Sequence, residues 1–105
     1  MEPKTEQNRP LLPWTSAPVP LPDDFPVSCS GRFVQRDRPI TKLHRHDVPE
    51  IGVCHNGSGL WVVEGKVLPF SEGDVTVITP DEVHLAQSRS GTVSEWSWIY
   101  FDPVR

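Results

Sequence analysis

The stretch HRHDVPEIGVCHNG, residues 44–57, decides how this chain is interpreted. Side chains alternate between the two faces of a β-strand, so His44 and His46 are expected to point the same way, roughly 7 Å apart. Glu50 shares their parity, provided that the strand continues past Pro49. Imidazole and carboxylate groups on one interior face indicate either a metal site or the polar floor of a pocket.

The sequence around this stretch alternates short β-rich runs with turn residues. The runs cover residues 32–35, 40–46, 50–55, 60–70, 75–79, 83–88 and 94–101, and turns are expected at residues 56–59, at 71–74 and near Gly91. The run LWVVEGKVLPF, residues 60–70, is expected to fold as a hairpin over Glu64-Gly65 or Gly65-Lys66. Since no window has a helical period, the sequence predicts a small all-β sandwich or barrel.

The N-terminal segment is rich in proline. Seven of the twelve prolines fall within the first 26 residues, a density that excludes helix and central strand. Apolar residues such as Trp14 and Phe25 are interleaved with them, so we expect residues 1–30 to form an extended arm, disordered over about the first ten. The arm either covers apolar surface of a barrel at residues 31–105, closes over its mouth as a lid, or packs against a second subunit.

Length and composition limit the class of protein. A chain of 105 residues allows one compact domain, and its net charge of -4 argues against direct contact with nucleic acid. No apolar run approaches the length of a membrane span, and the first ten residues lack the apolar core of a signal peptide. Two cysteines, Cys29 and Cys54, are too few for a disulfide framework. We therefore expect a cytoplasmic protein, with Cys54 as a small buried side chain.

A third histidine extends the ligand-type cluster. His84 begins a later strand, directly after the turn TPDEV, and a barrel can bring distant strands opposite one another. Together with His44, His46 and Glu50 it forms a set suited to Zn²⁺, Fe²⁺, Mn²⁺ or Ni²⁺. The alternative is a metal-free pocket in which the same four side chains act as hydrogen-bonding groups.

These residues resemble the two motifs of the cupin superfamily. The first motif is matched by His44, His46, Glu50 and Gly57, and the second is similar to GDVTVITPDEVH, residues 73–84. The resemblance covers about residues 31–103 and implies a double-stranded β-helix, or jelly-roll, barrel. In that family the four residues His44, His46, Glu50 and His84 would be the metal ligands. The chain departs from the usual motifs at three positions, where it has Arg38, Glu82 and Ser88.

Within that superfamily, residues 43–84 and the closing stretch EWSWIYFDP resemble the N-terminal sensor domain of AraC-type transcription regulators. The resemblance implies a domain that binds a small polar, sugar-like metabolite in the barrel and forms a homodimer. In that family a helix-turn-helix part, which nothing up to Arg105 resembles, contacts DNA. The alternative is a stand-alone metal-dependent cupin enzyme of the dioxygenase or sugar isomerase type. No general base or nucleophile stands out beside the four ligand-type residues, so the non-enzymatic interpretation is preferred.

The last strand carries the remaining candidates for ligand contact. Trp96, Trp98 and Tyr100 share one face, and Ile99 and Phe101 share the other. If the first face lines the cavity, Trp96 and Trp98 provide aromatic surface for a ring-shaped ligand. Alternatively, these side chains pack in the core or at a dimer contact. His55 has the opposite parity to His44 and is expected to face outward.

Overall fold

The computed structural model describes residues 13–104, which form ten strands and contain no helix that could cross a membrane. The strands are β1 (Trp14–Ser16), β2 (Val27–Cys29), β3 (Phe33–Gln35), β4 (Leu43–Arg45), β5 (Glu50–Asn56), β6 (Ser58–Val63), β7 (Lys66–Ser71), β8 (Val75–Ile78), β9 (His84–Ser88) and β10 (Ser94–Phe101). The prediction of an all-β domain is confirmed.

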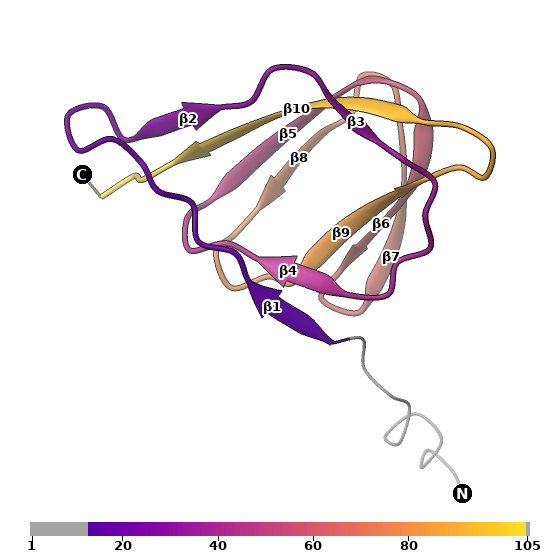
Figure 1. Ribbon diagram of the computed structural model, residues 1–105, viewed down its shortest axis with the longest axis horizontal. Coiled ribbons are helices and arrows are strands. Elements are labelled where there is room, and N and C mark those ends of the chain that lie inside the picture. Colours follow the sequence, from indigo (N-terminus) through magenta and orange to yellow (C-terminus); the bar gives the residue numbers. More distant parts are fainter. Residues whose placement is uncertain (1–12, 105) are drawn as a thin grey trace, which may run out of the picture.

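The strands form two sheets that face each other (Figure 1). One sheet has the order β1-β4-β9-β6-β7. The other has the order β2-β10-β5-β8, and β3 pairs with the first half of β10. Every pairing is antiparallel except that of β1 with β4. Because β4 and β5 are consecutive but belong to different sheets, the chain crosses from one layer to the other between Arg45 and Glu50.

Part of the predicted arm pairs with the sheets. Strand β1 lies along β4, where the Leu43 N–H donates to the Pro13 carbonyl at 2.8 Å and the Ala17 N–H donates to the Arg45 carbonyl at 2.8 Å. Strand β2 pairs with the end of β10. Both strands are three residues long and lie at sheet edges, the only sheet positions that suit a proline-rich segment. The prediction of disorder over the first ten residues lies outside the described part of the chain.

The predicted hairpin forms over Glu64-Gly65. Val63 pairs with Lys66, so the loop has two residues, and their φ angles are 47° and 79°. Positive φ at both central positions is the mark of the type I′ turn, whose twist matches that of the flanking strands. Glycine at the second position adopts this conformation without steric cost.

Replacing Gly65 with alanine is expected to destabilise the protein by about 1 kcal/mol. A Cβ at position 65 would meet no atom within 4 Å, so the cost comes from the backbone conformation alone. Urea unfolding followed by circular dichroism measures the difference. Gly31→Ala is the control, because position 31 is equally open and has no positive φ. An equal loss in both variants would contradict this explanation.

The core lies between the sheets, away from the crossing of β4 to β5. It is formed by Cys54, Trp61, Phe70, Ala86 and Trp96, and Val63 and Trp98 pack against it. Two buried hydroxyls beside it form a hydrogen-bonded chain: Ser88 Oγ donates to the Gln35 carbonyl and contacts Ser94 Oγ, which accepts the indole N–H of Trp96. The expectation that Cys54 is a small buried side chain is confirmed.

Candidate ligand-binding site

The four ligand-type residues converge, although not by the route expected. Strand β4 ends at Arg45 and β5 begins at Glu50, so the condition that one strand continues past Pro49 is not met. Pro49 lacks a backbone N–H and restricts the residue before it, which favours a break there. His44 and Glu50 therefore reach one another from two different sheets.

The strand pairing explains how His84 joins them. It begins β9 and is paired directly with His44 of β4, so both side chains point to the same side of that sheet. The ring centroid of His44 lies 4.6 Å from that of His84 and 4.7 Å from that of His46. One nitrogen atom from each of the three histidines lies within 4.8 Å of the others.

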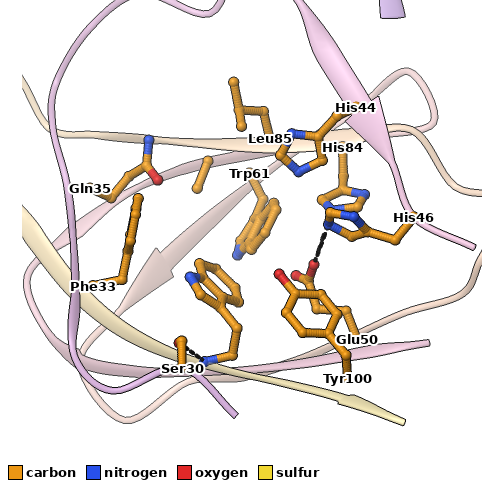
Figure 2. Close-up of a pocket in the computed structure, with 12 residues that line it drawn as sticks. Ser30, Phe33, Gln35, His44, His46, Glu50, Trp61, His84, Leu85 and Tyr100 are labelled. Carbon is orange, nitrogen blue, oxygen red and sulfur yellow. Dashed lines mark hydrogen bonds and ion pairs between the residues drawn. The ribbon is translucent and has the colours of Figure 1, made fainter. Parts of the chain in front are cut away.

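Glu50 closes the cluster from the opposite sheet. Its Oε1 lies 3.0 Å from His46 Nε2 and 3.3 Å from His84 Nε2, and its side chain is 3% exposed (Figure 2). Two ligands of one transition metal, each about 2.1 Å from the ion, lie roughly 3.0 to 3.4 Å apart, so these two spacings fit a shared ion.

The outer nitrogens of two histidines define their tautomers. His46 Nδ1 lies 2.8 Å from the Ala17 carbonyl, and His84 Nδ1 lies 2.9 Å from the Glu82 carbonyl. A carbonyl oxygen only accepts, so each Nδ1 must carry the proton. In the neutral rings both Nε2 lone pairs then face the Glu50 carboxylate, and His46 Nε2 is buried without an aligned hydrogen bond. A cation or a proton is needed between these acceptors, and the carbonyl contacts are those that orient metal-binding histidines.

The surroundings shift the pKa values of His44, Glu50 and His46 in different directions. Burial and the neighbouring His84 and His46 lower the pKa of His44 to about 4, so His44 is neutral at physiological pH. Burial alone would raise the pKa of Glu50, but the two facing imidazoles outweigh it and hold that pKa at about 2. Burial also opposes protonation of His46, yet Glu50 and the Ala17 carbonyl raise the pKa of this ring overall. The site thus combines a carboxylate and a neutral imidazole, the forms in which both bind metals.

A cavity of about 460 Å³ opens from this cluster. This volume is within the range of small-molecule sites. Its lining consists of Ser30, Phe33, Gln35, His44, His46, Glu50, Trp61, His84, Leu85, Ala86, Trp98 and Tyr100. Figure 2 shows the histidines, Glu50 and Tyr100 at one end and Phe33 and Gln35 at the other, with Trp61 between the two ends.

The face of β10 that carries Trp98 and Tyr100 is the one that faces the cavity. Trp98 and Tyr100 line the cavity, and Tyr100 is paired with Glu50 across the sheet. Trp98 is paired with Gly52, where a Cβ would lie 2.5 Å from its ring, so glycine is required for the indole to lie across β5. Burial and the Glu50 carboxylate raise the pKa of Tyr100 well above its usual range, which keeps the phenol protonated.

Trp96 does not line the cavity, although the sequence placed it with Trp98. It is 0% exposed and belongs to the core, where it stacks on Trp98 with ring centroids 4.8 Å apart and planes 6° from parallel. The assignment of Trp96 as a ligand contact is therefore corrected: Trp96 supports Trp98 from behind. His55, as expected, lies on the other face of β5, where its Nε2 is 2.7 Å from Ser97 Oγ.

Sequence reasoning missed several residues of the site. Tyr100 could have been found from its parity with Trp98, once the inner face of β10 was known. Phe33 and Gln35 come from the short strand β3 and carried no motif. The Ala17 carbonyl, which orients His46, is a backbone atom of the proline-rich segment and has no sequence signature.

Comparison with known proteins agrees with this geometry. The family model described as AraC-like ligand binding domain matches residues 28–105. No curated protein matches the chain in sequence. The similar solved structures include a Cupin 2 conserved barrel domain protein from Salinispora arenicola, with a TM-score of 0.66 and 23% identity over 82% of this chain and 72% of that one.

Two further structures have the same barrel. A cupin protein from Bacteroides fragilis has a TM-score of 0.61 and 20% identity, over 73% of this chain and 64% of that one. A predicted oxalate decarboxylase from Thermotoga maritima has a TM-score of 0.59 and 25% identity, over 67% of this chain and 62% of that one. The chain thus spans between 62% and 72% of the length of these three proteins. The predicted cupin barrel is confirmed.

Proposed function

Because this chain belongs to the AraC-like ligand binding domain family, we propose that it is the effector-sensing domain of a cytoplasmic transcription regulator. The observation that carries the proposal is the cavity, in which a polar cluster of three histidines and Glu50 faces an aromatic wall. Effector binding changes regulation only if the effector has different affinities for two arrangements of the protein. The segment from Trp14 to Ala17 is a candidate for the element that differs, since its Ala17 carbonyl binds His46 directly.

The experiment is chromatin immunoprecipitation with an antibody against this chain, in cells grown on different carbon sources. Enrichment of particular promoter fragments that changes with the growth substrate is expected of a sensor domain. This holds whether the DNA-contacting part lies in the same polypeptide or in a partner. Absence of any enriched promoter would contradict the regulatory role and favour the enzyme described below.

The cluster is proposed to hold one divalent transition metal through His44, His46, His84 and Glu50. The two Nε2 lone pairs that face Glu50, of which that of His46 has no aligned hydrogen bond, support this assignment. When bound, such an ion supplies a Lewis acid that attracts an oxygen of the ligand. The protein's own contribution is to fix the imidazoles of His46 and His84 through the Ala17 and Glu82 carbonyls.

A second candidate function is metal-dependent catalysis. It is favoured by the same cluster and by the protonated Tyr100 beside Glu50, and one similar structure is that of a predicted oxalate decarboxylase. Incubation of Mn²⁺-loaded or Fe²⁺-loaded protein with oxalate or O₂ tests it, with formate production and oxygen consumption as readouts. Turnover that is lost in Glu50→Gln would support the enzyme.

The partner proposed besides the effector is a second copy of this chain. The outer face of β8, β5 and β10 carries a cluster of apolar residues beside the polar pair His55 and Ser97. Val77 pairs with Ile51 and Ile51 with Ile99, and Val75 pairs with Val53. Val75 and Val77 are 62% and 66% exposed. From strand spacing and length this face measures about 450 Å². Two copies would bury roughly 900 Å², near the lower limit for a specific interface, which corresponds to a weak dimer.

We therefore expect Val77→Lys to make the protein monomeric, because a lysine ammonium buried in this contact would lose its hydration. Sedimentation equilibrium over a range of concentrations measures the dimer constant. Val93→Lys is the control, since Val93 is exposed in the loop between β9 and β10 and lies outside this face. Wild-type protein that remains monomeric at millimolar concentration would exclude this interface.

A further inference from the structure

The cavity has its charged groups at one end only. The three histidines and Glu50 lie together, whereas the remaining lining residues are aromatic, aliphatic or neutral polar side chains. A divalent ion bound by three neutral imidazoles and one carboxylate leaves a single positive charge at that end. Among the described lining residues, no other charged side chain compensates it. A ligand that completes this site therefore carries one negative charge, located at the histidine end.

The side chains that line the remaining walls of the cavity limit the chemical character of the uncharged part of the ligand. Phe33, Leu85 and Ala86 offer no polar side-chain atom. Trp98 offers only its indole N–H, and its ring is held flat against Trp96 by the 6° stack. Aromatic rings bury well on such a surface. A pentose or hexose would place several hydroxyl groups against these walls, and each hydroxyl without a partner opposes binding. The walls therefore favour a planar apolar body.

The polar atoms away from the cluster are few. The Ser30 hydroxyl already accepts the Trp98 backbone N–H at 3.0 Å. The Trp61 indole N–H is buried and has no hydrogen-bond partner among the described residues. The Gln35 side chain lies at the end opposite the histidines (Figure 2). The Gln35 amide and the Trp98 indole N–H can satisfy one or two polar substituents on a ring, not the full hydroxyl set of a sugar.

From this arrangement we propose that the cavity binds aromatic monocarboxylates, with the carboxylate at the histidine cluster and the ring on Trp98. The inference rests on the proposed function and on its metal site, and it replaces the sugar-like effector by a more specific class. The carboxylate supplies the missing charge, the ring covers Trp98, and a ring hydroxyl or carbonyl oxygen can accept from the Gln35 side-chain amide.

The test is isothermal titration calorimetry of the full chain loaded with one equivalent of Zn²⁺. The probes are benzoate, 2-naphthoate and indole-3-acetate, with uncharged benzamide and L-arabinose for comparison. At least one carboxylate is expected to bind with a Kd below about 1 mM. Its affinity should exceed that of benzamide and arabinose roughly tenfold or more, and it should fall to the level of benzamide in metal-free protein.

Variants locate the bound ring. Trp98→Leu should lower carboxylate affinity roughly tenfold without changing the Zn²⁺ affinity. Trp14→Leu is the matched control, because Trp14 is an exposed tryptophan that contacts Arg45 on the outer surface. If Trp98→Leu fails to fold, Gln35→Leu and Phe33→Ala at the other end of the cavity provide the same comparison.

The failure of this inference can be told apart from that of the proposed function. Arabinose that binds as tightly as the carboxylates, or benzamide equal to benzoate, would overturn the ligand class and leave a sensing cavity. The absence of binding by all three carboxylates to metal-loaded protein would also overturn it. If Zn²⁺ itself does not bind, the metal site and the ligand class both fall, whereas promoter enrichment still decides the regulatory role.

Discussion

Replacing His44 with alanine is expected to lower the affinity of the protein for Zn²⁺ by at least about 100-fold, while the domain stays folded. Loss of an outer partner of a metal ligand typically costs between about 10-fold and 100-fold, and loss of a ligand itself costs more. His44 is the ligand best suited to this experiment. It is less buried than His84 and Glu50, and it has no ion pair with Glu50 to be broken.

Two measurements establish the result. Elemental analysis gives the metal content of the purified protein, and competition with a chromophoric chelator at fixed pH gives the affinity. His55→Ala is the matched control, because His55 lies on the outer face of β5 and contacts Ser97. Equal Zn²⁺ affinity in wild type and His44→Ala would remove the metal site, and the four residues would then be the polar wall of a metal-free pocket.

Replacing Trp96 with alanine is expected to reduce the free energy of unfolding by about 3 to 5 kcal/mol. Trp96 is fully buried and contacts three aromatic rings, those of Trp61, Phe70 and Trp98, at centroid distances of 5.5, 4.9 and 4.8 Å. Its indole N–H also donates to Ser94 Oγ at 3.1 Å. Alanine would leave a cavity in the centre of the core and remove one of the two hydrogen bonds of the buried Ser94 hydroxyl.

The loss is large for a domain of this size, whose total stability is of the order of 5 to 15 kcal/mol. Trp96→Phe therefore accompanies it as a smaller change that should leave the protein folded. Chemical unfolding measures both, and Trp14→Ala at the surface is expected to cost no more than about 1 kcal/mol. Trp96→Phe should leave the Zn²⁺ affinity unchanged. A loss below 1 kcal/mol in Trp96→Ala would contradict the placement of this side chain in the core.

The regular elements of this protein could be predicted from its sequence because they depend on neighbours along the chain. Short β-rich runs between turn residues marked β5, β6, β7, β9 and β10, and the residues around Gly65 marked the hairpin turn. The spacing of His44, His46, Glu50 and His84 identified the cluster before any contact was known. A turn or a motif is a local property, and local properties are readable from residue type and spacing.

The cavity wall was less predictable. Parity placed Trp96, Trp98 and Tyr100 on one face of β10, but that face serves two environments along its length. At Trp96 the opposite sheet packs tightly and makes core, whereas at Trp98 and Tyr100 the sheets leave room for a ligand. The same parity therefore gave one core residue and two cavity residues. The division depends on the separation of the sheets, which no single strand encodes.

The sequence by itself determined the all-β class, the hairpin, the family and the identity of the ligand-type residues. Only the tertiary structure decided that Glu50 meets the histidines across two sheets, that β3 supplies the far end of the cavity, and that the Ala17 carbonyl orients His46. The reason is physical: strand periodicity and turn conformation are set by residues a few positions apart. Convergence of residues 17, 46, 50 and 84 is set by how two sheets pair and pack, to which almost every residue of the barrel contributes.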